Sequence, residues 1–281
     1  MTLITRSALV LSILLAFSCH RAPSDLKRHF DGIDGAFVLL DLNADQYVRY
    51  NPERCAQRFS PCSTFKIPHA LIALETQAVE NAEHLIRWDQ EKYPTSNPSW
   101  ARDHTLRTAF RNSAVWYFRE TAGTIGQEAM QDHLNRLDYG NRDLSSGLDG
   151  FWLRKSLEIS ADEQVAFIKR FYTGQFGYSE KHTATVKEML LREEAASYKL
   201  SAKTGSNGRG LGWLVGYVEK DDNVYFFAYN AQLPKDKASV SQRLNLVKEI
   251  LRDLRILPLM TPLTRQWDQK EQQLASRVSY N

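Results

Sequence analysis

Three cysteines are all that this 281-residue sequence contains, and no apolar run reaches the roughly 18 residues that are needed to cross a bilayer. An excess of one charge is also lacking. There are 36 Lys and Arg residues against 33 Asp and Glu, which gives no reason to expect a nucleic acid or an anionic surface as partner. The hydrophobic fraction of 43% and the charged fraction of 25% are those of an ordinary globular protein, and they argue against long disorder.

The sequence also lacks the spacing of a metal site or of a phosphate-binding loop. Its seven histidines are scattered, no two of them lie four residues apart, and no C-x-x-C occurs. The glycine-rich stretch GSNGRGLG at 205–212 has neither the lysine nor the hydroxyl of a phosphate loop, and it leads directly into a predicted strand. We therefore predict no metal and no nucleotide, and a turn or strand-edge role for these glycines.

The first residues, MTLITRSALVLSILLAFSCHRAPS, are typical of an export signal. Arg6 precedes an apolar run at 8–17, and the small residues Ser18 and Cys19 follow it. We predict a signal peptide over 1–18 and an exported protein of the periplasm or cell envelope. The alternative, a buried first helix, is disfavoured by the abruptly polar stretch that follows. Lipidation of Cys19 and plain cleavage close by both remain open.

Cys55 and Cys62 are the other two cysteines, and in an oxidising compartment they could pair. Their spacing ahead of a predicted helix does not ensure the Cα separation that a disulfide requires, so the bond is a hypothesis. At the other end of the chain, the polar, glutamine-rich residues 261–281 predict a short surface helix or a frayed tail.

Strand patterns lie near both ends of the chain, and helical patterns lie between them. A short apolar run at 36–42 is followed by a polar turn and by 46–50, and a similar pair at 211–219 and 224–230 flanks a second polar turn. The two patterns predict two strand–turn–strand units. Apolar residues at three- and four-residue spacing predict helices over 67–79, 105–122, 126–137, 160–172, 179–191 and 241–256. A capping box from Ser160 to Glu163 opens the fourth of these.

This order predicts an α/β chain of the α+β type. The sheet is antiparallel, because strands at both ends are joined by hairpins, and it is flanked by helices. We expect one catalytic domain over 19–281. Its sheet part is formed by about 30–60 and 196–260, and the mostly helical part at about 61–195 is inserted between them. An active site is expected in the cleft between the two parts.

Ser63-Thr64-Phe65-Lys66 is an S-x-x-K motif at the start of an apolar helix. Three residues on a helix bring two side chains to one face, so Lys66 can lie beside the Ser63 hydroxyl. A serine hydroxyl becomes a good nucleophile when an adjacent base takes its proton, and a lysine can be that base if burial lowers its pKa. The helix start also offers backbone N–H groups to an oxyanion. Taken alone, the motif equally describes a helix cap followed by a surface lysine.

Further motifs accompany it. Lys203-Thr204-Gly205 lies at the opening of the late strand region, as expected of an edge strand that lines a substrate. S-A-V at 113–115 falls in the helical part, and Y-G-N at 139–141 follows a helix. S-x-x-K, a second serine motif and K-T-G occur in this order in serine β-lactamases and penicillin-binding proteins.

From about Ala36 to Pro258, the chain resembles the class D (oxacillinase-type) serine β-lactamases. The matching stretches are FSPCSTFKIPHALIALET, WARDHTLRTAFRNSAV, LDYGN, FWLRKSLEISADEQVAF and SAKTG, and the Y-G-N and F-W-L elements are specific to that class. The resemblance implies the fold of serine β-lactamases and penicillin-binding transpeptidases. It also implies hydrolysis of β-lactam antibiotics, penicillins at least, through a serine acyl-enzyme.

By this resemblance Ser63 is the nucleophile, and Lys66 carries a carbamate, made from its amine and carbon dioxide, as general base for acylation and deacylation. Trp152 would hold the carbamate, although core packing is its alternative role, and Ser113 would relay a proton to the lactam nitrogen. No other cofactor and no metal is implied. The substrate-binding residues implied in the same way are Trp100, Val115, Leu153, Lys203, Thr204, Gly205, Ser206 and Arg243.

Among these, the backbone N–H groups of Ser63 and Ser206 would form the oxyanion hole. Lys203, Thr204 and Arg243 would receive the substrate carboxylate, with a solvated helix charge as the alternative for Arg243. The resemblance gives Tyr139 and Asn141 the task of holding the loop that forms the cleft wall. Cys62 and Ser206 depart from the family, which more often has alanine and an aromatic residue there. Trp116-Tyr117 is also bulkier than usual, so the substrate range is open.

Two other classes share these motifs. Sensor domains acylate and stay acylated, and they are tethered behind transmembrane helices that this sequence lacks. Y-G-N and F-W-L count against a small penicillin-binding peptidase. We therefore expect a turnover enzyme for small β-lactams with no nucleic-acid partner. It would meet the membrane only through a possible lipid on Cys19, and it could be a monomer or a homodimer.

Overall fold

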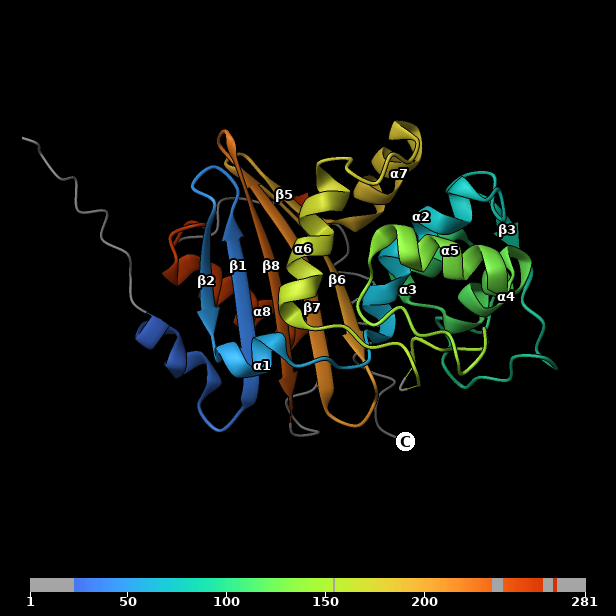
Figure 1. Ribbon diagram of the computed structural model, residues 1–281, viewed down its shortest axis with the longest axis horizontal. Coiled ribbons are helices and arrows are strands. Elements are labelled where there is room, and N and C mark those ends of the chain that lie inside the picture. The colour runs from blue at the N-terminus through green and yellow to red at the C-terminus, as the bar shows by residue number, and fades with distance from the viewer. Residues whose placement is uncertain (1–22, 154, 234–239, 260–264, 267–281) are drawn as a thin grey trace, which may run out of the picture.

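The computed structural model describes residues 23–153, 155–233, 240–259 and 265–266. A sheet carries helices on both faces, and a mainly helical region stands beside it (Figure 1). The predicted signal peptide and Cys19 lie outside the described residues. Within the described ranges, no helix is both long and apolar enough to span a membrane.

Seven strands form the sheet in the order β2-β1-β8-β7-β6-β5-β9, and every neighbouring pair is antiparallel. The strands span β1 Asp34–Asp41, β2 Gln46–Tyr50, β5 Leu191–Ala195, β6 Tyr198–Ser206, β7 Leu211–Lys220, β8 Asn223–Gln232 and β9 Arg265–Gln266. Early and late segments of the chain meet where β1 pairs with β8, from Asp34 opposite Gln232 to Asp41 opposite Tyr225. The predicted antiparallel sheet is therefore confirmed.

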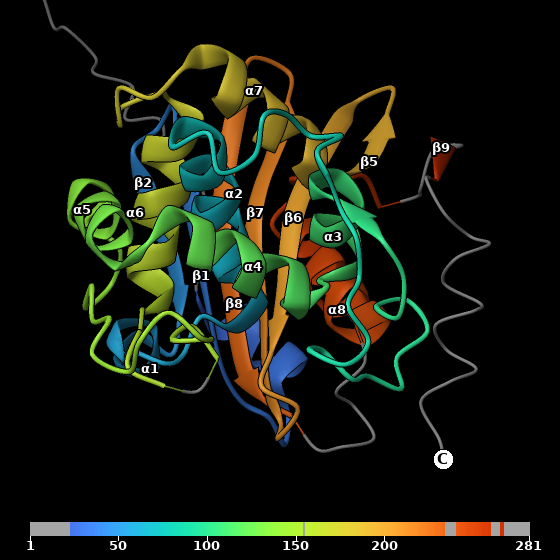
Figure 2. The same ribbon diagram turned by 90° about the vertical axis from the view of Figure 1, so that its right-hand side faces the viewer.

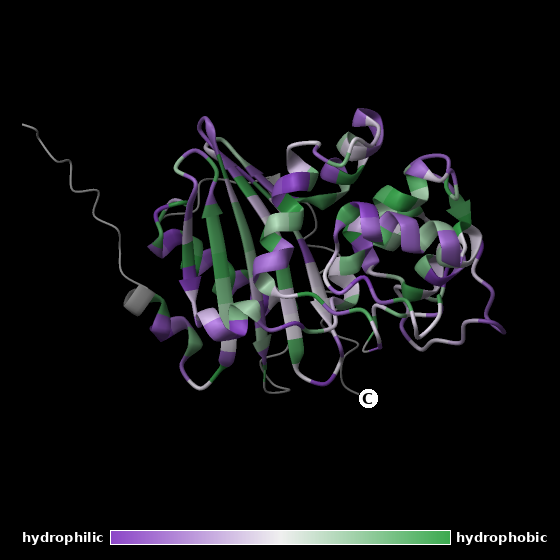
Figure 3. Ribbon diagram, in the orientation of Figure 1, coloured by the Kyte–Doolittle hydropathy of each residue, from purple (hydrophilic) through white to green (hydrophobic). Residues whose placement is uncertain are grey.

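Both faces of this sheet are covered, which explains why its central strands are apolar throughout. Consecutive residues of a strand point to opposite faces. In β7, Val215 belongs to the core on the side of α6 (Ala161–Tyr172), and its neighbour Leu214 belongs to the core on the side of α8 (Val240–Asp253). Figure 1 shows α6 in front of the sheet and α8 behind it, and Figure 3 shows the apolar band along β1 between them.

The remaining helices lie mostly in the helical region, which Figure 2 views with β6 and β7 behind it. The helices and 3-10 turns span η1 Pro23–Phe30, α1 Pro52–Ala56, η2 Cys62–Phe65, α2 Lys66–Glu75, α3 Leu106–Asn112, α4 Val115–Ile125, α5 Gln127–Leu137 and α7 Glu180–Leu190. A small sheet of β3 (Leu85–Ile86) and β4 (His104–Thr105) lies in the same region.

Helix α6 packs on the sheet, although its residues fall within 61–195, the range predicted for the helical part. It lies across the sheet and contacts β1 and β8, because its apolar stripe, including Val165 and Ile168, is buried in the core on that face. The capping box predicted at its start is present, with the Ser160 hydroxyl accepting from Glu163 N at 3.1 Å.

The helix predicted over 105–122 is two helices. Ser113 ends α3 in the left-handed conformation, with φ 54°, and Ala114 is extended before α4 begins. Few residues other than glycine adopt a positive φ, so apolar periodicity does not reveal such a break. The break takes the Ser113 side chain off the helical face.

Two smaller expectations also differ. β5 and β6 were not predicted as strands, because LREEA and YKLSAKTGS are rich in charged and small residues where a strand pattern needs apolar ones. Of the polar tail, the structure describes only Arg265–Gln266, which pairs with β5 as β9 where a surface helix or a frayed tail was expected.

Candidate active site

Ser63 lies in the 3-10 turn η2, and Lys66 is the first residue of α2, so the S-x-x-K motif spans the junction. Lys66 Nζ donates to Ser63 Oγ at 3.2 Å. Ser63 is half-buried, and Lys66 is completely buried. The motif is therefore not a cap followed by a surface lysine. It places an amine against a hydroxyl at the base of the helical region.

The surroundings of Lys66 are apolar and aromatic. Its Nζ lies 4.9 Å from the centre of the Phe118 ring. Burial lowers the pKa of Lys66 to about 7, against a small opposing effect of Cys62, and no carboxylate of the described residues raises it. Removal from water disfavours the charged form of an amine, so Lys66 is neutral over a much wider pH range than an exposed lysine.

Trp152 forms another part of this pocket and is completely buried. Its ring stacks on Phe65 with centroids 5.8 Å apart, and His69 meets it edge-on at 5.5 Å. Its indole Nε1 has no hydrogen-bond partner among the described residues. A buried N–H without an acceptor is costly, so this atom marks a place where a polar group would be stabilised.

The carbonyl group of Trp152 fastens its loop to the nucleophile turn. Trp152 O accepts from Ser60 Oγ at 2.8 Å and from Cys62 N at 3.0 Å. Trp213 on β7 holds the same segment from the sheet side, donating from Nε1 to Ser60 O at 3.0 Å. The residues before Ser63 are thus fixed from two directions.

A bond between Lys203 and Ser113 joins the sheet to the helical region. Lys203 Nζ donates to Ser113 Oγ at 2.5 Å and to the Thr204 carbonyl at 3.3 Å. Lys203 is completely buried. Burial lowers its pKa well below the ordinary value, and the charges of Arg192, Lys66 and Arg243 lower it further. The two arginines keep their positive charge, so this part of the site is attractive to an anion.

K-T-G lies at the end of β6, a strand of its own, and does not open the strand predicted at 211–219. β5 pairs with β6 only as far as Ser201, so no strand of the described residues pairs with Lys203–Ser206 on the side away from β7. A Cβ on Gly205 would lie 2.9 Å from Pro61 O and 3.1 Å from Thr64 Cγ2. Only glycine allows this approach, which brings the end of β6 against the nucleophile turn.

Arg243 lies on α8 and is 3% exposed, so it is not a solvated helix charge. It packs on Gly212 of β7, where a Cβ would come within 2.7 Å of Arg243 Cδ. Gly212 is the register partner of Ser206. Burial lowers the pKa of the Arg243 guanidinium, opposed by Tyr229 and Cys62. Arg243 therefore sits beside the end of β6, together with Thr204 and Ser206.

Trp100 stands at the end of α3, next to the break. Its Nε1 donates to Asn112 O at 2.9 Å, and its own carbonyl accepts from Trp116 Nε1 at 2.8 Å. Val115 begins α4 and is half-buried. Leu153, also half-buried, packs against the core beside Trp152. These residues border the site and contribute no polar group to it.

Tyr139 and Asn141 close the loop that carries Trp152. Asn141 Nδ2 donates to Ser156 O at 2.8 Å, and its Oδ1 accepts from Glu158 N at 3.0 Å. Tyr139 is completely buried and meets Phe65 edge-on at 5.5 Å. Among the described residues, neither side chain forms a hydrogen bond with the Ser63 hydroxyl. Their contribution is therefore to the shape of the loop.

Thr64, His69 and Gln164 also belong to this region, and no sequence motif assigns them a role. Gln164 Nε2 donates to Thr64 Oγ1 at 2.9 Å, and His69 Nε2 is 3.1 Å from Thr121 Oγ1. Burial lowers the pKa of His69 to about 3, with a further lowering by Lys66. One signal could have revealed Gln164: it is a polar residue on the apolar stripe of a predicted helix.

The disulfide hypothesis is wrong. The thiols of Cys55 and Cys62 are buried and are not joined to each other. Cys55 Sγ lies 3.2 Å from Tyr50 O, and burial raises its pKa to about 12. Cys62 Sγ lies 3.6 Å from Ser60 O. The two thiols point to different carbonyl groups.

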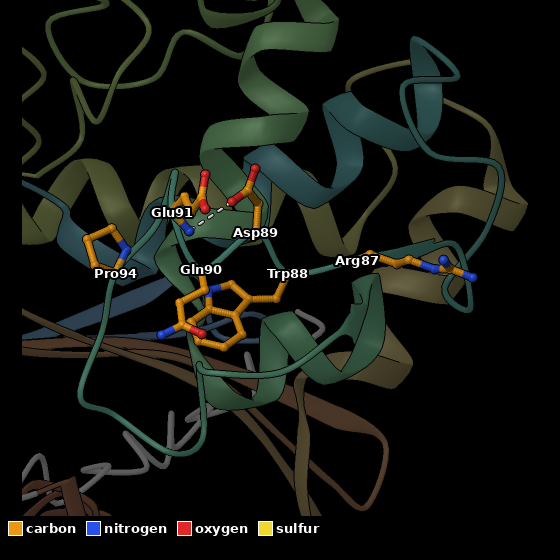
Figure 4. Close-up of a pocket in the computed structure, with 6 residues that line it drawn as sticks. All are labelled: Arg87, Trp88, Asp89, Gln90, Glu91 and Pro94. Carbon is orange, nitrogen blue, oxygen red and sulfur yellow. Dashed lines mark hydrogen bonds between the residues drawn. The ribbon is translucent and has the colours of Figure 1, made fainter.

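A surface hollow of about 890 Å³ lies elsewhere, at the outer end of the helical region beside β3. Its walls are Arg87, Trp88, Asp89, Gln90, Glu91 and Pro94 (Figure 4). The backbone N–H of Glu91 donates to Asp89 Oδ1 at 2.9 Å and shapes the turn. None of the predicted site residues lines it. Within the described ranges, no group of three or more His, Cys, Asp or Glu side chains could hold a metal ion.

Known proteins share this arrangement. The family model of the penicillin-binding protein transpeptidase domain matches residues 27–252. The probable β-lactamase YbxI of Bacillus subtilis (strain 168) is 39% identical over 259 residues, which cover 87% of this chain and 94% of that protein. The chain belongs to the class D β-lactamases. It is therefore a hydrolase of the serine β-lactamase type, as the motifs predicted.

Other class D β-lactamases agree. Beta-lactamase OXA-48 of Klebsiella pneumoniae is 39% identical over 227 residues, which cover 80% of this chain and 84% of that protein. The solved structure of class D β-lactamase BAT-2 matches with a TM-score of 0.78 and 37% identity, covering 85% of this chain and 99% of that one. FUS-1 (OXA-85) of Fusobacterium nucleatum subsp. polymorphum matches with a TM-score of 0.79 and 33% identity, covering 84% of this chain and 100% of that one.

Proposed function

We propose that this class D β-lactamase hydrolyses penicillins through an acyl-enzyme on Ser63, with Lys66 as general base after carbamate formation with carbon dioxide. The observation that carries the proposal is the 3.2 Å contact of Lys66 Nζ with Ser63 Oγ inside an aromatic pocket. The lowered pKa of Lys66, about 7, keeps the amine neutral in mildly alkaline solution. Only a neutral amine reacts with carbon dioxide, because the ammonium form has no free electron pair.

The pocket fits a carbamate on Lys66. Trp152 Nε1 is a buried donor without an acceptor among the described residues, and it would hold a carbamate oxygen. The Phe118 ring, 4.9 Å from Lys66 Nζ, and His69, which meets both Phe118 and Trp152 edge-on, connect the two side chains. When bound, the carbamate supplies an anionic general base beside Ser63. The unmodified amine can also accept a proton, but it is no longer a base once it is protonated.

Acylation begins when Ser63 Oγ attacks the carbonyl carbon of the β-lactam ring and gives up its proton toward Lys66. Negative charge then develops on the carbonyl oxygen, and the backbone N–H groups of Ser63 and Ser206 would receive it. The close packing of Gly205 on Pro61 and Thr64 supports this assignment, because it brings the two segments together.

The ring opens when its C–N bond breaks and the nitrogen takes a proton. Ser113 would supply that proton from its hydroxyl and take another from Lys203, which donates to it at 2.5 Å. The lowered pKa of Lys203 makes its ammonium form a ready proton donor. Lys203, Thr204 and Arg243 would attract the substrate carboxylate to the end of β6 and so orient the ring against Ser63.

A pre-steady-state trace with a chromogenic penicillin in bicarbonate buffer tests this function. A burst followed by sustained turnover supports it. A single stoichiometric burst followed by no turnover would show that the chain acylates and stays acylated, like a sensor domain. Absence of any reaction, with folding verified by circular dichroism, would overturn the acyl-enzyme itself.

We also propose that the chain is exported to the periplasm or cell envelope and that 19–281 forms one catalytic domain. The proposal rests on the pattern of 1–18 and on the small residues Ser18 and Cys19. Cell fractionation and the intact mass of the mature protein test it. A mass that corresponds to a protein beginning near residue 19 with added acyl chains would identify a lipoprotein. A full-length protein that stays in the cytoplasm with 1–18 uncleaved would refute export.

A further inference from the structure

Thr64, the residue after the nucleophile, ties the nucleophile turn to a helix that follows it by 100 positions. Its hydroxyl donates to Pro61 O at 2.7 Å and accepts from Gln164 Nε2 at 2.9 Å. Its backbone N–H donates to Pro61 O at 3.2 Å. Thr64 and Gln164 are both completely buried. Thr64 therefore forms the hydrogen bonds within the turn, and Gln164 binds the turn to α6.

Packing of α6 against the sheet does not by itself explain why a glutamine is buried at position 164. Its neighbours on the buried side of the helix include Val165 and Ile168, which belong to the apolar core. Its Oε1 is buried and has no hydrogen-bond partner among the described residues. A half-satisfied buried amide costs more than an apolar side chain of the same size. Its contact with Thr64 is what an apolar residue could not provide.

Thr64 also faces β6. A Cβ on Gly205 would lie 3.1 Å from Thr64 Cγ2 and 3.3 Å from Thr64 N, so the two segments are in direct contact. Ser63 precedes Thr64, and Ser206 follows Gly205. The position of Thr64 against Gly205 therefore sets the separation of the two backbone N–H groups that would receive the oxyanion.

Tyr139 of the Y-G-N motif lies beside the same amide. Burial raises the pKa of its hydroxyl, and interactions with the side chains of Thr64 and Gln164 oppose that rise. Its ring meets Phe65 edge-on at 5.5 Å and Phe167, on α6, at 5.0 Å. Tyr139 therefore packs between the nucleophile turn and α6, the two segments that Thr64 and Gln164 join.

We propose that Gln164 is a positioning residue of the active site. Through Thr64 it holds the nucleophile turn against Gly205, at the separation where the N–H groups of Ser63 and Ser206 converge on one oxyanion. The proposal rests on the acyl-enzyme chemistry proposed above. It assigns Gln164 to the tetrahedral state, in which charge sits on the oxyanion, and not to the initial binding of substrate.

Gln164→Leu and Thr64→Val test the pair, because each removes one half of the contact with little change in volume. We expect each to lower the acylation rate constant by about 10–100-fold, less than the loss of a whole oxyanion-hole donor. The affinity for phenylboronic acid, which forms a tetrahedral adduct on a serine, should fall in parallel. The saturation constant of the non-covalent penicillin complex should stay within about twofold, because only the tetrahedral state uses the hole.

Ile168→Val is the matched control. It loses a methyl group from the same helix and the same buried face, and it should lower the melting temperature without changing acylation or boronate affinity. Thr64→Val also loses the bond of its hydroxyl to Pro61 O, so it should lose at least as much as Gln164→Leu. The double variant Gln164→Leu, Thr64→Val should be no worse than Thr64→Val alone, since the contact of the two side chains is already gone there. Additive losses would mean that the two residues act separately and would overturn the proposal.

Boronate affinity separates this proposal from the proposed function. A wild-type enzyme that acylates but does not turn over refutes the deacylation chemistry and leaves the boronate comparison intact. A Gln164→Leu or Thr64→Val enzyme that binds phenylboronic acid as tightly as wild type refutes the positioning role, whatever the turnover. If one variant fails to fold, the other decides, because the proposal requires a loss of boronate affinity from each.

Discussion

Lys203 Nζ donates to Ser113 Oγ at 2.5 Å and so joins the end of a sheet strand to the break between two helices. Ser113 reaches the strand because it ends α3 in the left-handed conformation. A hydroxyl that accepts from a buried cation has its own proton free for another acceptor. In the proposed mechanism, this proton is the one that passes to the nitrogen of a bound β-lactam ring.

Ser113→Ala should lower the acylation rate constant by about 10²–10⁴-fold, the range of one lost proton-transfer group. Stopped-flow acylation with a chromogenic penicillin measures it. Ser145→Ala, at an exposed loop serine, is the control and should acylate at the wild-type rate. Normal acylation by Ser113→Ala would show that the lactam nitrogen receives its proton by another route.

Ser63→Ala should abolish the covalent adduct, because no other described hydroxyl lies at the Lys66 amine. Intact-protein mass spectrometry after incubation with penicillin measures this directly. In samples quenched with acid during turnover, part of the wild-type protein should carry the mass of one β-lactam, and the variant should carry none. Hydrolysis at the normal rate by the variant would refute the whole scheme.

Trp152→Phe should slow deacylation more than acylation. The substitution keeps most of the ring that packs on Phe65 but removes the Nε1 donor, so a carbamate on Lys66 would lose its hydrogen bond. The acyl-enzyme should accumulate after a burst. Carbon NMR with labelled bicarbonate gives a second readout: the carbamate signal should be present in wild type and weakened in the variant. An equal signal in both would remove Trp152 from this role.

Activity should fall as the pH drops through about 7. Burial places the pKa of Lys66 there, in contrast to the usual value of 10.5, so the amine is neutral above about pH 7 and protonated below it. The ammonium form can neither accept the Ser63 proton nor react with carbon dioxide. The pH profile of kcat/KM, recorded in degassed buffer and again with added bicarbonate, tests both points. Bicarbonate should raise activity near neutrality, and no response would contradict the carbamate.

Gly212→Ala should raise KM by displacing Arg243. The added Cβ would come within 2.7 Å of Arg243 Cδ and 3.2 Å of Leu233 Cδ1, so the arginine must move away from the end of β6. We expect a KM increase of about tenfold, as for one weakened charge contact to the substrate carboxylate, and a similar change in Arg243→Ala. Gly123→Ala, whose Cβ meets no atom within 4 Å, is the matched control. An unchanged KM in Gly212→Ala would separate Arg243 from substrate binding.

The sequence predicted the antiparallel sheet and the main polar residues of the site. The strands β1, β7 and β8 are visible as apolar runs because both faces of the sheet are covered there. The S-x-x-K and K-T-G motifs are short and ordered, so they identify Ser63, Lys66 and Lys203 without knowledge of the fold.

What the sequence could not provide depends on contacts between distant segments. The break at Ser113 comes from one residue with a positive φ inside an unbroken apolar pattern. Gln164 acts on Thr64 only because α6 crosses the sheet, which helical periodicity does not specify. That the indole N–H of Trp152 has no hydrogen-bond partner among the described residues can also be recognised only when its neighbours are known. Such features arise from packing and not from local sequence.

The pairing of β1 with β8 has a consequence for how the chain acquires its structure. Asp34 lies opposite Gln232, so the middle of the sheet joins residues that are almost two hundred positions apart. Contacts of this separation form slowly, since a long loop must close before any of them is made. Strand β8 must therefore be synthesised before β1 can pair with it. A chain truncated before Asn223 should remain unfolded and should be cleaved readily by proteases.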